Sequence, residues 1–389
     1  MLARALWGPA LVAAAVLAAC GDAGPSATAA PLRFLHTFGA RDAAFLDEAL
    51  AGWPAPVATS LVPFARGQTV IGALLRAGHD CPDLIRIDAT WLPALAAAQL
   101  LRPAPPAIRD RDWLPEARAL AEDRGQLWGA PQTVDGLVVL SAGDATGPAP
   151  ATLDALIATA ERAMTTHRWG LGLRADGYWF VPFLRAAGGE LAAPATDAAA
   201  APDPIDSAAA IAALTRFAEL FPRIAAPPAS PGQEDATEAR RFRAGEVAFL
   251  VTGPWALPDL GDVAALTVWP LPGAPRGGHL LVVPACARDA DGAWRLAARL
   301  TEPEIQTAWA RALGTVPTTA TALAAAPSAV RAVHDALTAA RPLPRDPHTP
   351  LLFDDLTPAV AAVVAGDATA SEALAGVRRG WARLTEPSP

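Results

Sequence analysis

Apolar residues along this chain follow two spacings, one typical of strands and one typical of helices. Strands that alternate with helices indicate α/β layers with largely parallel sheets. Residues 192–204 are rich in alanine and proline, which predicts a surface loop. Short apolar runs bounded by turn residues predict strands at 32–36, 83–87, 136–140, 170–173, 247–251 and 280–283. Apolar positions three and four apart predict helices at 40–51, 92–101, 152–165, 179–187 and 206–221, and mostly helix after residue 293.

The N-terminus has the pattern of an export signal. Arg4 precedes an apolar stretch at 5–19, which is shorter than the roughly 20 residues that span a bilayer. The stretch ends in the sequence LAAC, and small residues before a cysteine resemble the bacterial lipobox, in which the thiol is acylated and the chain is cut before it. We therefore predict a lipoprotein signal peptide at 1–19, a lipid on Cys20, and a flexible tether at 20–31. A plain signal peptide is the alternative.

Composition narrows the class of protein. The chain has 39 acidic and 31 basic residues, which are interspersed and form no positive stripe of the kind that nucleic acids need. A length of 389 residues suggests about two domains. No segment after the signal is long and apolar enough to span a membrane. In an oxidising compartment Cys81 and Cys286 could form a disulfide, but two buried free thiols are an equal alternative.

Sequence motifs of the common catalytic and cofactor sites are missing. The chain has no GxSxG, HExxH or GxxxxGK[ST] motif, and its six histidines lack the spacing of a zinc helix. The segment 289–292, Asp-Ala-Asp-Gly, lacks the later ligands of a calcium loop and predicts a turn. We therefore expect no catalytic residue, no metal and no cofactor.

Aromatic and acidic residues gather at strand ends and turns. Flat aromatic faces suit the C–H face of a pyranose, and carboxylates accept charge-assisted hydrogen bonds from neighbouring hydroxyls. In open α/β sheets, ligands bind at the carboxyl ends of strands. This composition is what a sugar site needs. The residues concerned are Asp88 and Trp91 beyond one strand, Asp135 before another, Tyr178 at a loop-to-helix junction, Trp255 after Gly-Pro, and His279 after Gly277-Gly278.

Several segments resemble, in order, the extracellular solute-binding proteins of carbohydrate ABC transporters, of the maltose/trehalose-binding type. The resemblance covers nearly all of the mature chain, and the GPW segment and the Asp-x-x-Trp turn are its most specific parts. The segments are DLIRIDATWLPALAAAQLL (83–101), WGAPQTVDGLVVL (128–140), DGYWFVPFLRAAGGEL (176–191), FRAGEVAFLVTGPWALPDL (242–260), LPGAPRGGHLLVVP (271–284) and AWRLAARLTEPEIQTAWARALGTVPT (293–318).

The resemblance assigns roles to single residues. Asp88 and Asp135 match acids that bind sugar hydroxyls, and Trp255 matches a stacking tryptophan; the alternatives are turn, strand-capping and core residues. Trp91 and Tyr178 line the site or pack beside it. Gly277 and Gly278 match a glycine-rich turn that brings backbone amides to the ligand, or simply make a turn. His279 departs from the family, where an aromatic residue is common. Near Arg41 and Asp42 the register is ambiguous, and the loop 63–67 looks shorter than usual.

The resemblance implies a two-lobed α/β fold of the periplasmic-binding-protein type II, in which each lobe is a doubly wound sheet with flanking helices. We expect an N-terminal lobe at 32–138 and 263–320 and a C-terminal lobe at 139–262 and 321–389. The protein would be an exported, lipid-anchored monomer on the periplasmic or cell-surface side. It would bind a sugar, by preference a di- or oligosaccharide, and deliver it to a membrane permease. The alternatives are a solute-binding component that feeds a sensor, and an extracellular glycan-active enzyme.

Overall fold

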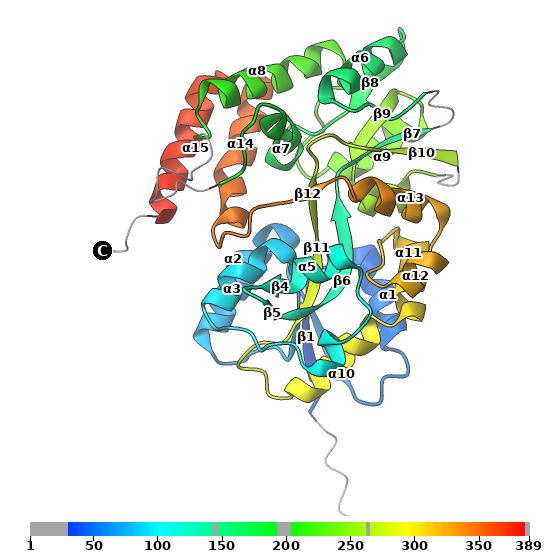
Figure 1. Ribbon diagram of the computed structural model, residues 1–389, viewed down its shortest axis with the longest axis vertical. Helices are drawn as coiled ribbons and strands as arrows, with labels where there is room; N and C mark the ends of the chain where they lie inside the picture. The colour runs from blue at the N-terminus through cyan, green and yellow to red at the C-terminus, as the bar shows by residue number, and fades with distance from the viewer. Residues whose placement is uncertain (1–29, 143–146, 193–203, 262–264, 386–389) are drawn as a thin grey trace, which may run out of the picture.

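The structure, a computed structural model, describes residues 30–142, 147–192, 204–261 and 265–385. The chain forms two lobes, each built around a β-sheet (Figure 1). The predicted signal peptide, Cys20 and nearly all of the predicted loop at 192–204 lie outside the described residues. The larger sheet has the order β12-β11-β3-β1-β2, and β6 also pairs with β11; the smaller sheet has the order β10-β7-β9-β8.

The larger sheet consists of β1 (Leu32–His36), β2 (Val57–Leu61), β3 (Leu84–Asp88), β6 (Gly129–Gly136), β11 (Pro275–Val282) and β12 (Arg341–Pro342), and the smaller sheet of β7 (Val138–Ala142), β8 (Trp169–Gly172), β9 (Val247–Thr252) and β10 (Leu266–Pro270). A short hairpin joins β4 (Glu122–Asp123) to β5 (Gln126–Leu127).

Helices cover both sheets (Figure 1). Around the larger sheet lie α1 (Ala40–Leu50), α2 (Phe64–Ala77), η1 (Ala89–Trp91), α3 (Leu92–Ala97), α4 (Pro106–Arg109), α5 (Pro115–Ala121), α10 (Ala290–Leu300), α11 (Pro303–Leu313) and α12 (Ala320–Ala325). Around the smaller sheet lie α6 (Leu153–Ala163), α7 (Gly177–Ala186), α8 (Ala208–Arg223), α9 (Glu234–Arg243), η2 (Pro254–Asp259), α13 (Ser328–Leu337), η4 (Thr349–Leu351), α14 (Leu352–Ala365) and α15 (Ala370–Thr385).

The sheets are mixed, and the expectation of largely parallel sheets was wrong. The parallel pairs are β1–β2, β1–β3, β8–β9 and β11–β12. In the two main sheets the described antiparallel pairs all involve β7 or β11, which pair with β9 and β10, and with β3 and β6. Each of these two strands directly follows a point where the chain passes from one sheet to the other. β7 runs antiparallel to both of its neighbours, and β11 runs antiparallel to β3 and β6 but parallel to β12.

Local chemistry explains where the predicted helices begin and end. The side chain of Asp176 accepts a hydrogen bond from the Tyr178 amide, so α7 starts two residues earlier than predicted. α3 ends at Ala97, before the predicted end, because Gln99 adopts a left-handed backbone with φ 56°. α8 includes Pro222 in its last turn, where we expected it to stop the helix, and ends at Arg223.

The chain passes between the sheets at Leu137 and again at 271–274. The predicted run 136–140 is therefore the junction of β6 and β7 rather than one strand. A third segment, 338–348, runs from α13 between the lobes and contributes β12 to the larger sheet (Figure 1). We call these three the interlobe segments.

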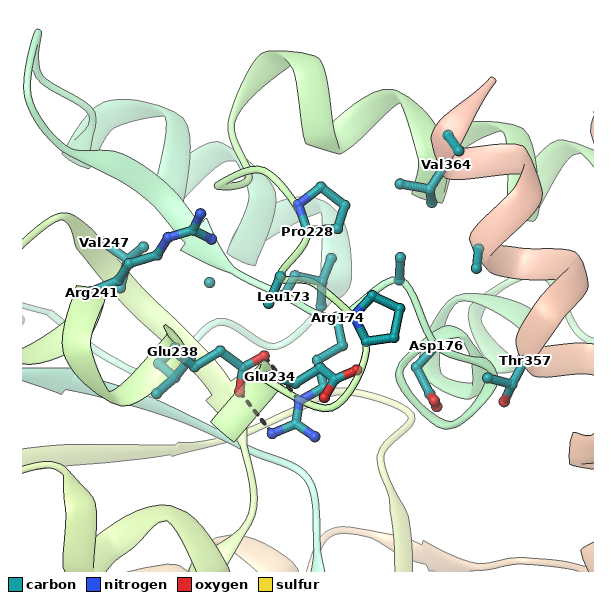
Figure 2. Close-up of a pocket in the computed structure, with 17 residues that line it drawn as sticks. Leu173, Arg174, Asp176, Pro228, Glu234, Glu238, Arg241, Val247, Thr357 and Val364 are labelled. Carbon is teal, nitrogen blue, oxygen red and sulfur yellow. Dashed lines mark hydrogen bonds and ion pairs between the residues drawn. The ribbon is translucent and has the colours of Figure 1, made fainter. Parts of the chain in front are cut away.

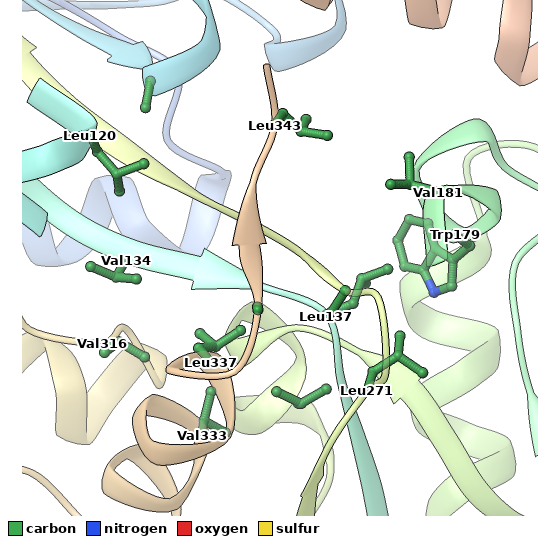
Figure 3. Packing of buried hydrophobic residues seen from close by; sticks show 14 of the residues in the cluster. Leu120, Val134, Leu137, Trp179, Val181, Leu271, Val316, Val333, Leu337 and Leu343 are labelled. Carbon is green, nitrogen blue, oxygen red and sulfur yellow. The ribbon is translucent and has the colours of Figure 1, made fainter. Parts of the chain in front are cut away.

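Two strands pair in a different sheet from the one that the predicted lobe boundaries imply. β10 pairs with β7 in the smaller sheet, although we placed residues 263–320 in the other lobe. β12 pairs with the larger sheet, although it lies within 321–389. We therefore propose that the lobes meet at the interlobe segments. Buried side chains that include Leu137, Leu271 and Leu337 form a continuous apolar cluster there (Figure 3).

A disulfide joins Cys81 and Cys286, with 6.0 Å between their Cα atoms, which resolves the alternative left open by the sequence. Beside it the buried carboxylate of Asp83 accepts hydrogen bonds from the backbone amides of Arg33, Arg288 and Asp289 at 3.0, 2.9 and 3.1 Å. Burial alone acts to raise the pKa of Asp83, but these hydrogen bonds and that of the Arg288 side chain lower it. The disulfide and the hydrogen bonds of Asp83 therefore both stabilise the junction of β1, β3 and the chain after β11.

Candidate functional site

Strand register brings three of the predicted residues onto one face of the larger sheet. In the antiparallel pair β3–β11, His279 lies opposite Asp88, and in the pair β6–β11, Gly277 lies opposite Asp135. Because residues two apart on a strand share a face, Asp88, Asp135 and His279 point the same way. The Nδ1 atom of His279 lies 3.2 Å from Oδ2 of Asp135, close enough for an ion pair but not in hydrogen-bond geometry.

Asp88 both caps a turn and faces this cluster. Its Oδ1 accepts hydrogen bonds from the backbone amide of Thr90, at 2.7 Å, and from the Thr90 hydroxyl. Burial raises the pKa of Asp88, and the charge of Asp135 raises it further, while His279 and Thr90 act to lower it. Both hydrogen bonds that hold the turn go to Oδ1 rather than to Oδ2.

Two glycines allow β11 to lie close to its neighbours. They lie within the strand, which begins five residues before the predicted start, rather than in a turn as expected. Gly278 has φ 158°, and a Cβ atom there would lie 2.2 Å from the carbonyl oxygen of Thr133. A Cβ atom at Gly277 would lie 3.1 Å from Oδ1 of Asp135. Their absent side chains therefore leave room for strand pairing and for the Asp135 carboxylate.

Phe64, which was not among the predicted site residues, supplies the exposed aromatic surface beside this cluster. We took 63–67 as a loop, but α2 begins at Phe64. Phe64 is 53% exposed. Its ring lies 5.6 Å from that of Trp91 at 30° and 5.9 Å from that of His279. Trp91 itself is 5% exposed and packs against Gly67, so it supports Phe64 from behind. No local pattern marked Phe64, because its role depends on ring contacts with Trp91 and His279 that are distant in sequence.

The smaller lobe contributes Tyr178 and Trp255. Asp176 holds Tyr178 in the first turn of α7, where the Tyr178 ring lies 6.1 Å from that of Phe353. Burial raises the pKa of Tyr178 well above its usual value, followed by the negative charges of Asp135 and Asp88. These charges belong to the other lobe, so the two halves of the predicted site act on each other.

Trp255 is one of the few large apolar residues at the surface of the described chain. It lies in η2, is 37% exposed, and meets the buried Trp179 edge to face at 6.3 Å. The Trp179 ring is held by a hydrogen bond from its Nε1 to the carbonyl of Val251, at 2.8 Å. A fixed tryptophan therefore supports an exposed one.

η2 also connects the lobes. Arg41, at the start of α1, donates to both carboxylate oxygens of Asp259 at 2.6 and 3.1 Å. Its neighbour Asp42, whose role was ambiguous, accepts a hydrogen bond from the Gly39 amide at 3.2 Å and caps α1. The region that the sequence left undecided is thus an interlobe contact.

Beneath the acidic cluster lies a buried arginine. Arg86, on the same face of β3 as Asp88, donates to the side chains of Gln132 and Thr37 at 3.0 Å each and lies over the Phe38 ring. Burial lowers the pKa of Arg86 to about 10. The nearby carboxylates of Asp42, Asp135 and Asp88 act in the opposite direction on the pKa of Arg86.

A cavity of about 490 Å³ lies elsewhere, within the smaller lobe (Figure 2). Arg174 lies at its wall, where its guanidinium is paired with Glu238 at 2.9 Å and with Asp235 at 2.5 Å. It includes none of the predicted site residues. Because the charge of Arg174 is already neutralised by these two carboxylates, we do not place the ligand there.

Neither a metal site nor a membrane span is found in the part of the chain that the structure describes. No three His, Cys, Asp or Glu residues are grouped so as to hold an ion, and no helix is long and apolar enough to cross a membrane.

The family follows from comparison with known proteins. Residues 64–336 match the bacterial extracellular solute-binding proteins, and the chain belongs to this family. The family confirms the resemblance and implies an exported protein that binds a solute. A comparison with curated protein sequences gives no match.

Solved structures confirm the two-lobed fold. The GacH receptor of Streptomyces glaucescens, solved without ligand and with acarbose, is 26% identical, with 91% of this chain and 98% of that chain covered and a TM-score of 0.77. The maltotriose-binding protein of Thermus thermophilus is 20% identical, with 91% and 100% covered and a TM-score of 0.73. A solute-binding protein of Agrobacterium radiobacter K84, in complex with ribitol, is 19% identical, with 91% and 100% covered and a TM-score of 0.76.

Proposed function

We propose that this protein binds a carbohydrate between its lobes, a di- or oligosaccharide by preference, and delivers it to a membrane permease. The observation that supports this most is the strand register, which sets Asp88, Asp135 and His279 on one face of the larger sheet beside the exposed ring of Phe64. Tyr178 of the smaller lobe, whose pKa is raised by burial and then by the charges of Asp135 and Asp88, lies within electrostatic range of these acids. The similar structures that hold acarbose and maltotriose suggest the ligand class.

The ligand would act by holding the lobes together. Asp88, Asp135 and His279 would receive its hydroxyls, while Phe64 and Trp255 would cover its apolar faces. A ligand shifts the balance between open and closed forms only through contacts that differ between them. Contacts from both lobes meet this condition, so a permease could distinguish loaded from empty protein.

Binding can be tested by thermal shift and calorimetric titration with acarbose, maltotriose and ribitol. A ligand present at about 100 times its dissociation constant should stabilise the protein by about 2.7 kcal/mol. Recovery of each sugar unchanged after long incubation would support binding without catalysis. A panel of sugars that neither stabilise nor bind, or a sugar that is cleaved, would contradict the proposal.

We further propose that Cys20 is acylated and anchors the protein to a membrane. The lipobox-like LAAC sequence supports this. In cells that express the full chain, Cys20→Ser should lose incorporation of labelled palmitate and appear in the soluble fraction. Equal labelling of the variant would rule out this anchor.

A further inference from the structure

Arg185, in the last turn of α7, is a buried arginine at the junction of the lobes. Its side chain is only 1% exposed. One terminal nitrogen, Nη1, donates to the carbonyls of Ala274 and Arg341 at 3.1 Å each, and to that of Gly273 at 3.4 Å. The other, Nη2, donates to the carbonyl of Pro342 at 2.9 Å. One guanidinium therefore holds two of the three interlobe segments.

Glu190 completes this arrangement. Both of its carboxylate oxygens accept from Nε of Arg185, at 2.9 and 3.0 Å, and one lies 3.7 Å from the guanidinium of Arg341. A guanidinium presents its donors in a planar fork, whereas a lysine ammonium is a compact point charge on a flexible chain. Only an arginine can reach a carboxylate and four carbonyls at once from this position.

The segment 271–274 also rests directly on α7. Gly273 has φ 78°, and a Cβ atom there would lie 2.9 Å from the carbonyl oxygen of Pro182. β12 in turn pairs with the start of β11, so both segments and α7 form one packed unit. The same helix carries Tyr178 at its other end.

We propose that Arg185 is a positioning residue for ligand binding, which fixes the axis about which the lobes close. Hinge motions are absorbed by a few backbone dihedral angles. Clamped carbonyls at 273–274 and 341–342 keep the bending away from these residues and keep α7, with Tyr178, in a constant relation to these interlobe segments. Loosening the clamp widens the range of lobe orientations, and a smaller binding-competent fraction lowers the apparent affinity.

The test compares Arg185→Lys with a matched control, Arg111→Lys. Arg111 also donates to carbonyls, those of Ala298 and Thr301 at 2.9 and 3.2 Å, but within the larger lobe alone. Spin labels on the exposed positions Glu48→Cys and Arg162→Cys, in a Cys20→Ser background, report the interlobe distance by pulsed electron paramagnetic resonance.

Without ligand, the distance distribution should broaden in Arg185→Lys and stay unchanged in Arg111→Lys. The affinity for maltotriose and acarbose, which rests on the proposed function, should fall roughly twofold to thirtyfold in Arg185→Lys only. The proposal is overturned if Arg185→Lys has the same interlobe distance distribution and the same sugar affinity as Arg111→Lys.

Two arms keep the test decisive. If Arg185→Lys does not fold, Glu190→Gln, at a partly exposed position, is measured in the same way, and an unchanged distance distribution overturns the proposal. If no probe binds the wild-type protein, the proposed function has failed, and the ligand-free distances alone decide the role of Arg185.

Discussion

At Asp88 the needs of stability and of binding oppose each other. Burial raises the pKa of this carboxyl group above its unfolded value. A group with a raised pKa binds its proton more tightly in the folded state, so its contribution to stability is greatest in acid and is lost as the pH rises through the raised pKa. At neutral pH the ionised Asp88 therefore costs stability, which a binding role would explain.

We expect Asp88→Asn to stabilise the ligand-free protein at pH 7 and to weaken sugar binding roughly tenfold to a hundredfold, since hydrogen bonds to charged groups contribute about 1.5–3 kcal/mol. The asparagine can still accept the Thr90 hydrogen bonds. Urea unfolding at pH 7 and pH 4, with titration of maltotriose, measures both effects, and the stability gain should shrink at pH 4. Asp110→Asn, at the surface, is the control. Destabilisation at pH 7 would show that the turn needs the charge.

Trp255 and Trp381 provide a matched pair of tryptophans. Trp255 is 37% exposed, whereas Trp381 is 1% exposed. Trp255→Ala should weaken sugar binding by about thirtyfold or more, a loss of about 2 kcal/mol, with little change in stability. Trp381→Ala should cost about 3–5 kcal/mol of stability. Calorimetry beside urea unfolding distinguishes them. If Trp255→Ala unfolds readily yet its folded fraction binds normally, Trp255 is a core residue.

Single residues also show which parts of the candidate site could be predicted from the sequence. Asp88, Asp135 and His279 were predicted as site residues because each adjoins a strand end, a local feature, and the register now places them on one face. Their role in binding remains a prediction. Phe64 and the pair of Arg41 with Asp259 could not be found in this way. Their structural roles depend on contacts between residues that lie up to 218 positions apart in the sequence.

Among the elements, most buried strands were predicted, with β6 as an exception, and the exposed strand β2 was not. β1 matches its predicted bounds, and β3 lies within one residue of them, since both have apolar residues that are buried. β2, with the sequence VATSL at the sheet edge, is mostly exposed and lacks the alternation that marks a strand. The helix α2 that follows it was likewise not predicted. β2 buries little, so its apolar pattern is weak, whereas α2 buries Ile71 and Leu75 and its amphipathic pattern was overlooked.

The disulfide should stabilise the larger sheet in particular. It ties the chain before β3 to the chain after β11 across 205 residues. Replacing both cysteines by alanine should cost about 2–5 kcal/mol. Urea unfolding of Cys81→Ala/Cys286→Ala, followed by tryptophan fluorescence, measures the loss. The wild-type protein under reducing conditions should show a similar loss, and a double variant as stable as the oxidised protein would contradict the prediction.

On the scale of the whole molecule, Arg41 and Asp259 form an exposed ion pair between the lobes. Exposed ion pairs contribute roughly 0.2–1 kcal/mol and weaken with salt. Arg41→Ala should therefore lower sugar affinity by at most about fivefold at low salt, and the difference from wild type should vanish in concentrated salt. Solution scattering should show a larger radius of gyration for the ligand-free variant. Arg216→Ala, which breaks a pair within one lobe, is the control. A salt-independent effect would exclude the ion pair as its cause.

The strand order has a further consequence for how the protein is made. All strands of the smaller sheet lie between residues 138 and 270, whereas the larger sheet needs β11, at 275–282, between β3 and β6. β1, β2 and β3 pair with one another, whereas the described partner of β6 is β11. A chain that emerges from a membrane N-terminus first can therefore pair the smaller sheet while β6 and one edge of β3 still lack β11. Contacts far apart in sequence form slowly. We expect β3 and β6 to be the strands most open to proteases and to aggregation during export, although both precede β11 in the chain.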